Sequence, residues 1–243
     1  MPVFNVPPGT GMHLERLSVA MVEPRFGLNI GYVARTMKNF GVSHLFIVGK
    51  DDVPRSAIRF ASHGADIVKG AEYVSLRELR KKFDVVVGTT AITGSRGRNP
   101  VRKTVSLDAL ATLRVDPADM VIVLGRDTTG LTATELNACD IVAHVHTGTS
   151  YPTLNISHAL AIMLYKLSST ESAEARRVDR VYMDRMLKYF SEMLGVSRYP
   201  EHRRRMAIKI LGNAMIQSGA QQDEIIALMG VFRKVNLALE RRF

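Results

Sequence analysis

The chain has 243 residues, of which 46% are hydrophobic and 23% charged, a balance that excludes wholesale disorder and predicts a substantial folded core. Its formal net charge of +10 favours a polyanionic partner, such as nucleic acid or an anionic membrane surface. The single cysteine, Cys139, excludes an intrachain disulfide and any multi-cysteine metal site. Because no signal-peptide pattern or membrane-length apolar run is present, we expect a cytoplasmic protein that does not enter the membrane.

Short apolar runs rich in β-branched residues predict strands that are buried on both faces. These runs lie at 17–22, 44–49, 84–90, 120–125 and 141–146. Helical patterns alternate with them at 29–40, 56–62, 75–82, 106–113, 132–138 and 155–167. The alternation predicts an α/β fold with a mostly parallel sheet, and ligands of such sheets bind in the loops that follow the strands.

A polar segment, "SSTESAEARRVD", follows Leu167 and reads as a linker or a solvated helix start. No strand pattern appears after about Val178, and helical patterns occupy 178–194, 200–217 and 221–242. The sequence therefore predicts an α/β domain over residues 1–170 and a small all-α extension over residues 171–243.

Arg35 lies in the first long helical pattern, where Ile30, Val33, Ala34 and Met37 form one apolar stripe. At 100° per residue, Arg35 is about 140° around the helix from Ile30, on the polar side. It is either an ordinary solvated arginine or a functional group, and the helix alone does not decide between them.

Two basic segments are candidates for phosphate contacts, with an ordinary solvated surface as the alternative for each. The first is a glycine-rich loop after the strand pattern at 84–90, and the second is "HRRRMAIKI" in the helical extension. The candidate RNA contacts are Arg96, Arg98, Arg102 and Lys103 in the loop and Arg203, Arg204, Arg205 and Lys209 in the extension.

Two further loops follow predicted strands. "LGRDTTGLT" allows close backbone approach at Gly125 and Gly130, yet it contains neither a dinucleotide nor a P-loop phosphate motif. In "GTSYPTLNISHA", Thr153 and Asn155 precede an apolar helix, so each is also a candidate helix cap. His144 and His146 alternate along the strand pattern at 141–146, but no further ligand lies at a matching spacing, so we expect no metal site.

Three segments in chain order carry a resemblance to a known family. "NIGYVARTMKNFG", "VLGRDTTGL" and "YPTLNISHA" resemble the three motifs of the SpoU branch of the SPOUT RNA methyltransferases. The likeness covers roughly residues 15–168. The helical tail resembles the C-terminal extension of the TrmJ group, which are tRNA 2′-O-methyltransferases that act at anticodon-loop position 32.

The resemblance implies a trefoil knot at the C-terminal edge of the sheet and a homodimer. It also implies that the knotted region binds S-adenosylmethionine and that Arg35 reaches into the site of the other subunit. There, Arg35 contacts the ribose 2′-OH or the adjacent phosphate and stabilises the developing oxyanion. The resemblance also implies that Thr153 orients the ribose and that Asn29 and Asn155 are fixing groups.

The resemblance further implies that the cofactor rests on small residues and backbone groups. These are Thr89, Thr90, Ala91, Gly125, Val145, Pro152, Thr153 and Leu154. Two positions depart from the family pattern: Asp127 stands where glutamate is usual, and "YPT" replaces a serine-rich stretch.

The function that follows is an S-adenosylmethionine-dependent RNA ribose 2′-O-methyltransferase, with tRNA position 32 as the expected target. One alternative is methylation of rRNA or of another tRNA position. Another is a catalytically weak RNA-binding protein on the same scaffold, which Asp127 and Thr153 would favour if they spoil the site. A nucleotide-binding enzyme on an ordinary doubly wound sheet is disfavoured by the missing phosphate motifs.

Overall fold

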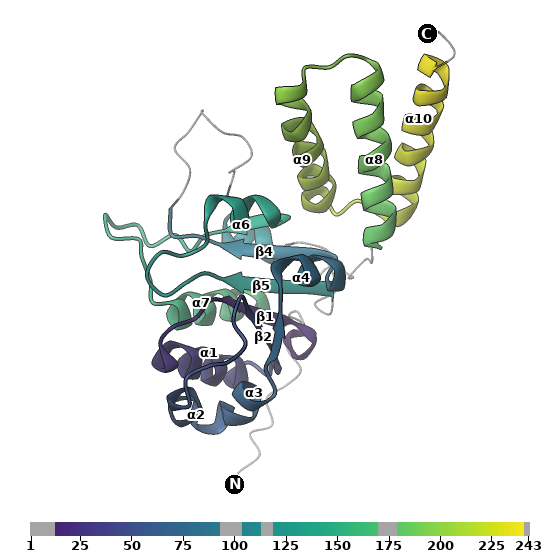
Figure 1. The fold of residues 1–243 in the computed structure, drawn as a ribbon. Helices are drawn as coiled ribbons and strands as arrows, with labels where there is room; N and C mark the ends of the chain where they lie inside the picture. Colours follow the sequence, from purple (N-terminus) through teal and green to yellow (C-terminus); the bar gives the residue numbers. More distant parts are fainter. Residues whose placement is uncertain (1–12, 93–103, 113–118, 170–178, 241–243) are drawn as a thin grey trace.

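The computed structural model describes residues 13–92, 104–112, 119–169 and 179–240. Within these ranges a six-stranded sheet has the order β3-β2-β1-β5-β4-β6, and every pair of neighbouring strands is parallel. Figure 1 labels the four middle strands, β2, β1, β5 and β4. The strands are β1 (Ser18–Val22), β2 (His44–Val48), β3 (Glu72–Val74), β4 (Val85–Thr89), β5 (Met120–Leu124) and β6 (Ile141–Ala143). The expected α/β fold with a mostly parallel sheet is confirmed.

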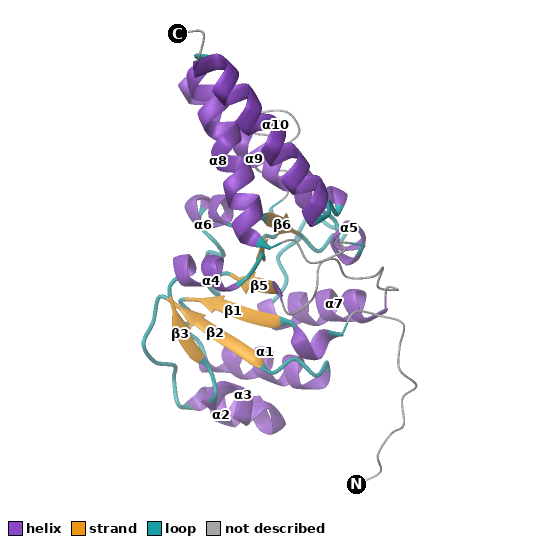
Figure 2. Cartoon of the chain, turned by 90° about the vertical axis from the view of Figure 1, so that its right-hand side faces the viewer, coloured by secondary structure: helices purple, strands orange, loops and turns teal. Residues whose placement is uncertain are grey.

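Helices cover both faces of the sheet. In the α/β part these are α1 (Gly27–Asn39), α2 (Ser56–Ala61), α3 (Ala65–Lys69), α4 (Leu76–Lys82), α5 (Leu107–Ala111), α6 (Ala133–Ala138) and α7 (Ile156–Ser169). Short 3-10 helices lie at Leu14–Arg16 and Ser62–Gly64. Figure 2 shows α1, α2 and α3 on one side of the strands and α4 on the other.

Alternating side chains of the strands divide the core into two apolar layers. Val19 and Met21 of β1 face the layer that contains α1 and α7, whereas Ala20 and Val22 face the layer that contains α4. All five residues of β1 are buried, so this strand is shielded from water on both faces. Burial on both faces explains why the sequences of β1 and β5 are almost continuously apolar.

The expected helices and strands differ from the structure in three places. β3 and α3 were not expected, and both are short elements without a clear apolar period. The strand expected at 141–146 ends at Ala143, so His144 and His146 follow the strand instead of alternating along it.

Three longer helices form the C-terminal extension: α8 (Arg180–Val196), α9 (Glu201–Ser218) and α10 (Gln222–Glu240). They have an apolar cluster of their own around Met183, Met186 and Ile225. The rings of Phe190 and Phe232 join α8 to α10, with 5.1 Å between their centroids. The boundary expected at residue 170 lies outside the described residues and stays a prediction.

Arg180, the first residue of α8, fixes the extension to the sheet. Its guanidinium donates to both carboxylate oxygens of Asp140 at 3.1 and 3.0 Å and to the carbonyl oxygens of Phe83 and Asp84. On α9, the Lys209 ammonium donates to the Asn137 carbonyl oxygen at 2.7 Å. The Arg180 side chain is 14% exposed, so the bonds that Arg180 makes are shielded from water.

The trefoil knot implied by the family resemblance stays a prediction, because residues 93–103 and 113–118 of the connection between β4 and β5 lie outside the described residues. Among the residues that are described, no helix is both long and apolar enough to cross a membrane.

Candidate active site

A pocket of about 420 Å³ opens at the carboxyl ends of three neighbouring strands. Thr89, Leu124 and Ala143, the last residues of β4, β5 and β6, all line it. Ligands of open parallel sheets bind at this edge, and the volume lies in the range of small-molecule sites. The pocket is therefore the candidate active site.

Eight residues were expected around a cofactor, and the structure brings all of them to the wall of this one pocket. They are Thr89, Thr90, Ala91, Gly125, Val145, Pro152, Thr153 and Leu154. Ile92, Thr104 and Met163 also line the pocket and were not expected there. Their part in binding a cofactor stays a prediction.

One wall of the pocket is a tight turn over residues 125–131, between β5 and α6. Arg126 and Gly130 form an isolated antiparallel bridge in which each backbone N–H donates to the other residue's carbonyl, at 3.2 and 3.0 Å. Gly130 has a φ of +68°, and a Cβ on Gly125 would collide with the backbone of Gly130. Glycine is therefore required at both positions by the shape of the turn.

Asp127, at the tip of this turn, binds the start of α1. Its Oδ2 accepts from the backbone N–H groups of Arg25 and Phe26 at 2.8 and 3.3 Å. Its Oδ1 accepts from the Asn29 side-chain amide at 2.6 Å. Thus the shorter carboxylate, in place of the glutamate expected from the family, makes three hydrogen bonds, and the one from Asn29 joins two of the three motifs.

The third motif joins the same chain of contacts through Asn155. The Asn155 amide donates to the Asn29 Oδ1 at 2.9 Å. Its own Oδ1 accepts from the Ser157 backbone N–H and hydroxyl, at 3.0 and 2.8 Å, and thereby caps α7. Asn155 thus caps α7 and is bonded to Asn29 of α1, whereas its part in a catalytic site stays a prediction. Thr153 is exposed at the pocket.

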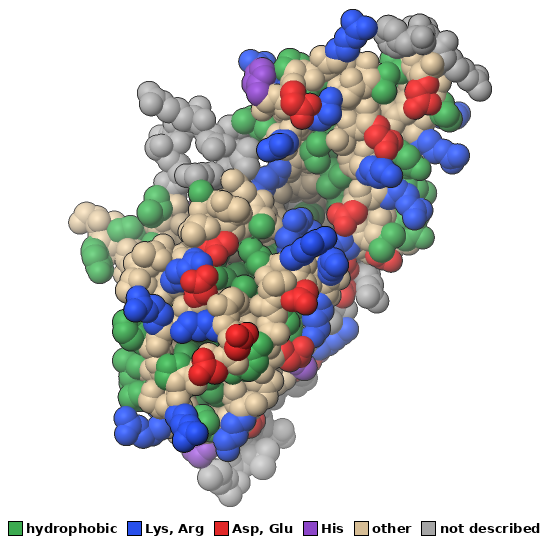
Figure 3. Space-filling view, in the orientation of Figure 1, with side chains coloured by type: hydrophobic (Ala, Val, Ile, Leu, Met, Phe, Trp, Pro, Cys, Tyr) green, Lys and Arg blue, Asp and Glu red, His purple; other side chains and the backbone are tan. Residues whose placement is uncertain are grey.

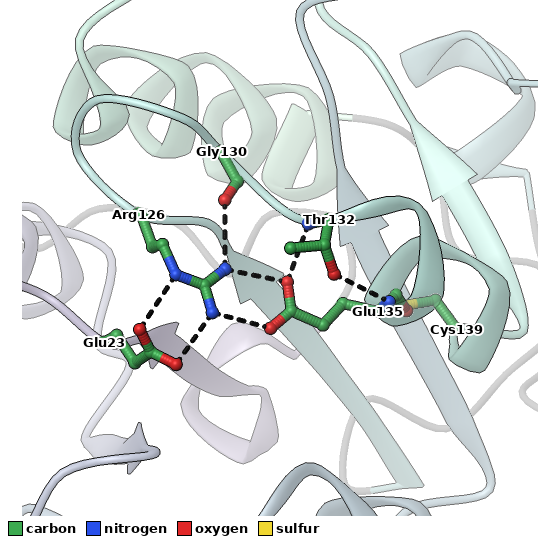
Figure 4. A network of polar contacts seen from close by, with 6 residues as sticks. All are labelled: Glu23, Arg126, Gly130, Thr132, Glu135 and Cys139. Carbon is green, nitrogen blue, oxygen red and sulfur yellow. Dashed lines mark hydrogen bonds and ion pairs between the residues drawn. The ribbon is translucent and has the colours of Figure 1, made fainter.

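A second polar cluster was missed by sequence reasoning (Figure 4). Arg126 lies between Glu23, which directly follows β1, and Glu135 of α6. The two carboxylates raise the pKa of Arg126 further above its ordinary value, and hydrogen bonds from Arg126 lower the pKa of Glu135 to about 2. The Thr132-to-Glu135 spacing in the sequence signals a capping box, which the structure contains, but it gives no sign of the arginine.

Arg35 is exposed on α1 and does not line the pocket of its own chain. Within the described residues its guanidinium has no hydrogen-bond or ion-pair partner. It lies on the same helix face as Leu28 and Tyr32, at i, i+4 and i+7, and both of these apolar side chains are exposed. The expected position off the apolar stripe is confirmed, whereas its chemical role stays a prediction.

The described residues contain no group of three or more His, Cys, Asp or Glu side chains that could hold a metal ion. His144 and His146 pack edge to face with centroids 6.4 Å apart.

Cys139 is buried, and desolvation raises the pKa of its thiol to about 12, so it is not a reactive nucleophile at neutral pH.

The candidate phosphate contacts differ in their surroundings. Arg203 is exposed on α9, and Arg204 pairs with Glu201 at 3.2 Å. The Lys209 ammonium is already bound to α6, and burial lowers its pKa. Arg96, Arg98, Arg102 and Lys103 lie outside the described residues. Figure 3 shows Lys and Arg side chains on both parts of the molecule, including the region where they meet.

Comparison with known proteins places the chain in a family. The model of the SpoU rRNA Methylase family matches residues 16–165. A protein of Methanocaldococcus jannaschii named tRNA (cytidine-2′-O-)-methyltransferase TrmJ is 28% identical over 229 residues, which are 89% of this chain and 98% of that protein. Its namesake from Sulfolobus acidocaldarius is 23% identical over 228 residues, covering 93% and 96%.

Among solved structures, TrmJ from Z. mobilis ZM4 has a TM-score of 0.65 and 21% sequence identity, over 90% of this chain and 98% of that one. This likeness extends beyond the α/β part and supports the fold as a whole.

Proposed function

The chain belongs to the SpoU rRNA methylase family, and from this premise we propose that it transfers a methyl group from S-adenosylmethionine to a ribose 2′-OH of RNA. The observation that carries the proposal is the pocket at the ends of β4, β5 and β6, which gathers residues from two of the three family motifs and is joined to the third through Asp127. The relatives' names support tRNA as the substrate, and anticodon-loop position 32 is the target we propose.

The pocket suits a nucleoside-sized ligand with an apolar body and several polar groups. Leu124, Leu154 and Met163 supply apolar wall, while Thr90 and Thr153 supply hydroxyl groups. S-adenosylmethionine supplies a methyl group that its sulfonium centre already activates. Since no further activation is required, the residues of the chain have only to bind the donor, orient the ribose 2′-OH and stabilise the developing oxyanion. The proposal therefore needs no metal ion.

Arg35 enters the reaction, in this proposal, from a second copy of the chain. Its own pocket does not include it, and it shares an exposed helix face with Leu28 and Tyr32. On the neighbouring helix α7, Ile162 and Tyr165 are 41% and 65% exposed. Exposed apolar side chains on two adjacent helices favour a covered surface, and a homodimer through α1 and α7 would carry Arg35 towards the partner's pocket.

The guanidinium of Arg35 is suited to stabilise charge on oxygen. A ribose 2′-OH is a poor nucleophile, and the oxyanion that develops as it loses its proton is stabilised by a fixed cation. Because arginine stays protonated, its part is charge stabilisation or phosphate contact, and it does not act as a simple base. Thr153, exposed at the pocket, would orient the ribose.

In this proposal the C-terminal extension and the basic loop bind the RNA. Arg203 and Arg204 on α9, together with Arg96, Arg98, Arg102 and Lys103, would contact RNA phosphates. The bonds of Arg180 and Lys209 hold the extension against the α/β part, so α9 can present its cations at a fixed position. A cytoplasmic location, expected from the sequence, belongs to the same proposal.

The decisive experiment supplies the purified protein with S-adenosylmethionine labelled at the methyl group and with unmodified tRNA. We expect label in the tRNA as a 2′-O-methylated nucleoside, and mapping by mass spectrometry places it at position 32. Label at another position would retain the chemistry and reject the target. S-adenosylmethionine binding without transfer to any RNA would favour the catalytically weak RNA-binding protein.

A further inference from the structure

We propose that Arg126 is a positioning residue for the methyl donor: its guanidinium holds the turn over residues 125–131 in the shape that forms one wall of the pocket. The inference rests on the proposed function, because it assigns the donor to this pocket. It gives a role to Arg126, which lies inside the segment "VLGRDTTGL" but for which the sequence predicted none. It also makes donor affinity depend on Glu23, 103 positions away in the chain, and on Glu135.

The Arg126 guanidinium clamps the base of the turn to two other elements (Figure 4). Its Nε and Nη2 donate to the two oxygens of Glu23 at 3.0 and 2.8 Å. Its Nη1 and Nη2 donate to the two oxygens of Glu135, both at 2.9 Å. Two bidentate pairs fix the plane of the guanidinium, which a lysine ammonium could not do.

The same side chain closes the turn on itself. Arg126 Nη1 also donates to the Gly130 carbonyl oxygen at 3.4 Å, beside the backbone bridge between the two residues. Glu135 Oε2 additionally accepts from the Thr132 backbone N–H at 2.7 Å, where the turn passes into α6. The beginning of the turn, its end and the first turn of α6 are therefore held by one charged centre.

Arg126 lines the pocket but has no donor left for a ligand. The five N–H groups of a guanidinium match the five hydrogen bonds that it makes. Its side chain is 19% exposed and that of Glu135 is 18% exposed, so the pair of Arg126 and Glu135 is shielded from solvent, whereas the Glu23 side chain is 46% exposed. The residue thus acts on a bound donor through the turn and not by direct contact.

The residues at the tip of the 125–131 turn are the ones that the bonds of Arg126 hold in position. Asp127, the next residue, binds the start of α1 and the Asn29 amide. Thr128, Thr129 and Gly130 follow it along the pocket wall. A turn released at its base would change both the wall and the position of Asp127, so donor binding is the property most directly affected.

The test compares Arg126→Met, Arg126→Lys and the wild type in the full chain. Calorimetry gives the Kd for S-adenosylmethionine, and steady-state kinetics give separate KM values for donor and RNA. We expect Arg126→Met to weaken donor binding and raise the donor KM by about tenfold or more, since small displacements of a binding wall are costly. The KM for RNA stays within a factor of two, and Arg126→Lys, which keeps the charge, falls between Arg126→Met and wild type.

Arg180→Met is the matched control, because Arg180 is also a shielded arginine bound to a carboxylate on both oxygens, yet it lies outside the pocket lining. We expect it to lower the melting temperature while leaving the donor Kd within a factor of two. A donor Kd for Arg126→Met within a factor of two of wild type would overturn the inference. Equal loss of donor affinity in Arg126→Met and Arg180→Met would overturn it as well.

Glu23→Gln provides a milder variant in case Arg126→Met does not fold, because it keeps the Arg126 to Glu135 pair. Weaker donor binding in Glu23→Gln supports the clamp, and an unchanged donor Kd contradicts it. The wild type distinguishes the role of Arg126 from the proposed function, because absence of S-adenosylmethionine binding in the wild type rejects the proposed function itself. Wild-type binding together with unaltered variants rejects only the role of Arg126.

Discussion

The side-chain amide of Asn155 donates to the side-chain oxygen of Asn29 over 2.9 Å, although the two residues are 126 positions apart in the chain. This bond fixes the orientation of both amides. Ser157 donates to Asn155 Oδ1, so the Asn155 amide nitrogen must face Asn29, and the Asn29 nitrogen must then face Asp127. The cap of α7 therefore determines, through two amides, that an acceptor is required at position 127.

Asp127→Asn tests this directional chain. The new amide nitrogen can face either the Asn29 nitrogen or the two backbone N–H groups, and each choice sets donor against donor. We expect the free energy of unfolding to fall by about 1–3 kcal/mol, because hydrogen bonds to a charged acceptor are lost and one of the facing donors is left without an acceptor. Chemical denaturation followed by circular dichroism measures it.

Asp66→Asn is the control for the loss of one carboxylate charge, because Asp66 makes an exposed ion pair with Lys38 at 2.6 Å. Such pairs contribute about 0–1 kcal/mol. Equal effects of the two substitutions would contradict the special role of the acceptor at position 127.

Much of the fold could be predicted because its elements are strongly patterned. The run "MVIVLG" is apolar throughout, and β5 is buried along its whole length. α1 follows its apolar stripe, and Arg35 is exposed as the helical wheel predicts. In contrast, β3 has the sequence Glu72–Val74 and is mostly exposed, so it owes its strand conformation to pairing with β2 and not to a pattern of its own.

The candidate site was predicted where a motif is continuous in sequence and missed where charges meet across the fold. Thr153 and Gly125 stand in recognisable motifs. Arg126 and Glu23 are 103 positions apart, and no local spacing shows that they form an ion pair. In the sheet, Met21 of β1 is paired with Leu124 of β5, and this register brings Glu23 and Arg126, each two residues further along the chain, close together. The register is known only from the folded sheet.

Arg35→Ala is expected to lower kcat by about 100-fold or more while donor affinity and folding change little, because the loss of one oxyanion-stabilising group costs that much. Arg35 is exposed and has no partner within the described residues, so its replacement is not expected to destabilise the fold. Single-turnover methyl transfer with saturating tRNA measures the effect. Lys38→Ala, an exposed cation on the same helix, serves as control, and turnover of Arg35→Ala within a few-fold of wild type would reject the role of Arg35.

The lowered pKa of Glu135 predicts that the stability of the fold depends on pH. Arg126 holds the pKa of this carboxyl at about 2 in the folded protein, below the ordinary value of 4.5 that the unfolded chain is expected to show. Between these values the unfolded state binds more protons, so the bridge stabilises the fold above about pH 4.5 and its contribution is lost as the pH falls towards 2. Melting temperatures of wild type and Glu135→Gln from pH 7 to pH 2.5 should converge on acidification. Parallel curves would show that Glu135 does not carry this effect.

The extension offers a comparison between two neighbouring arginines of α9. Arg203 is exposed, whereas Arg204 is bound to Glu201 at 3.2 Å and packs against Gly195. If α9 contacts RNA phosphates, Arg203→Ala should weaken binding of different RNAs alike and reduce the slope of log K against log salt by about 0.7–0.9, the value for one phosphate contact.

Arg204→Ala should change that slope less, because the arginine is already engaged within its own helix. Filter binding of tRNA at several salt concentrations measures both variants, and circular dichroism checks that α9 is retained. Arg98→Ala, in the basic loop, is measured in the same series as an independent contact. Glu201→Gln gives the matched control: by freeing Arg204 from its carboxylate it should strengthen RNA binding. Unchanged affinities and slopes in all four variants would mean that the net charge of +10 acts on RNA from another part of the surface.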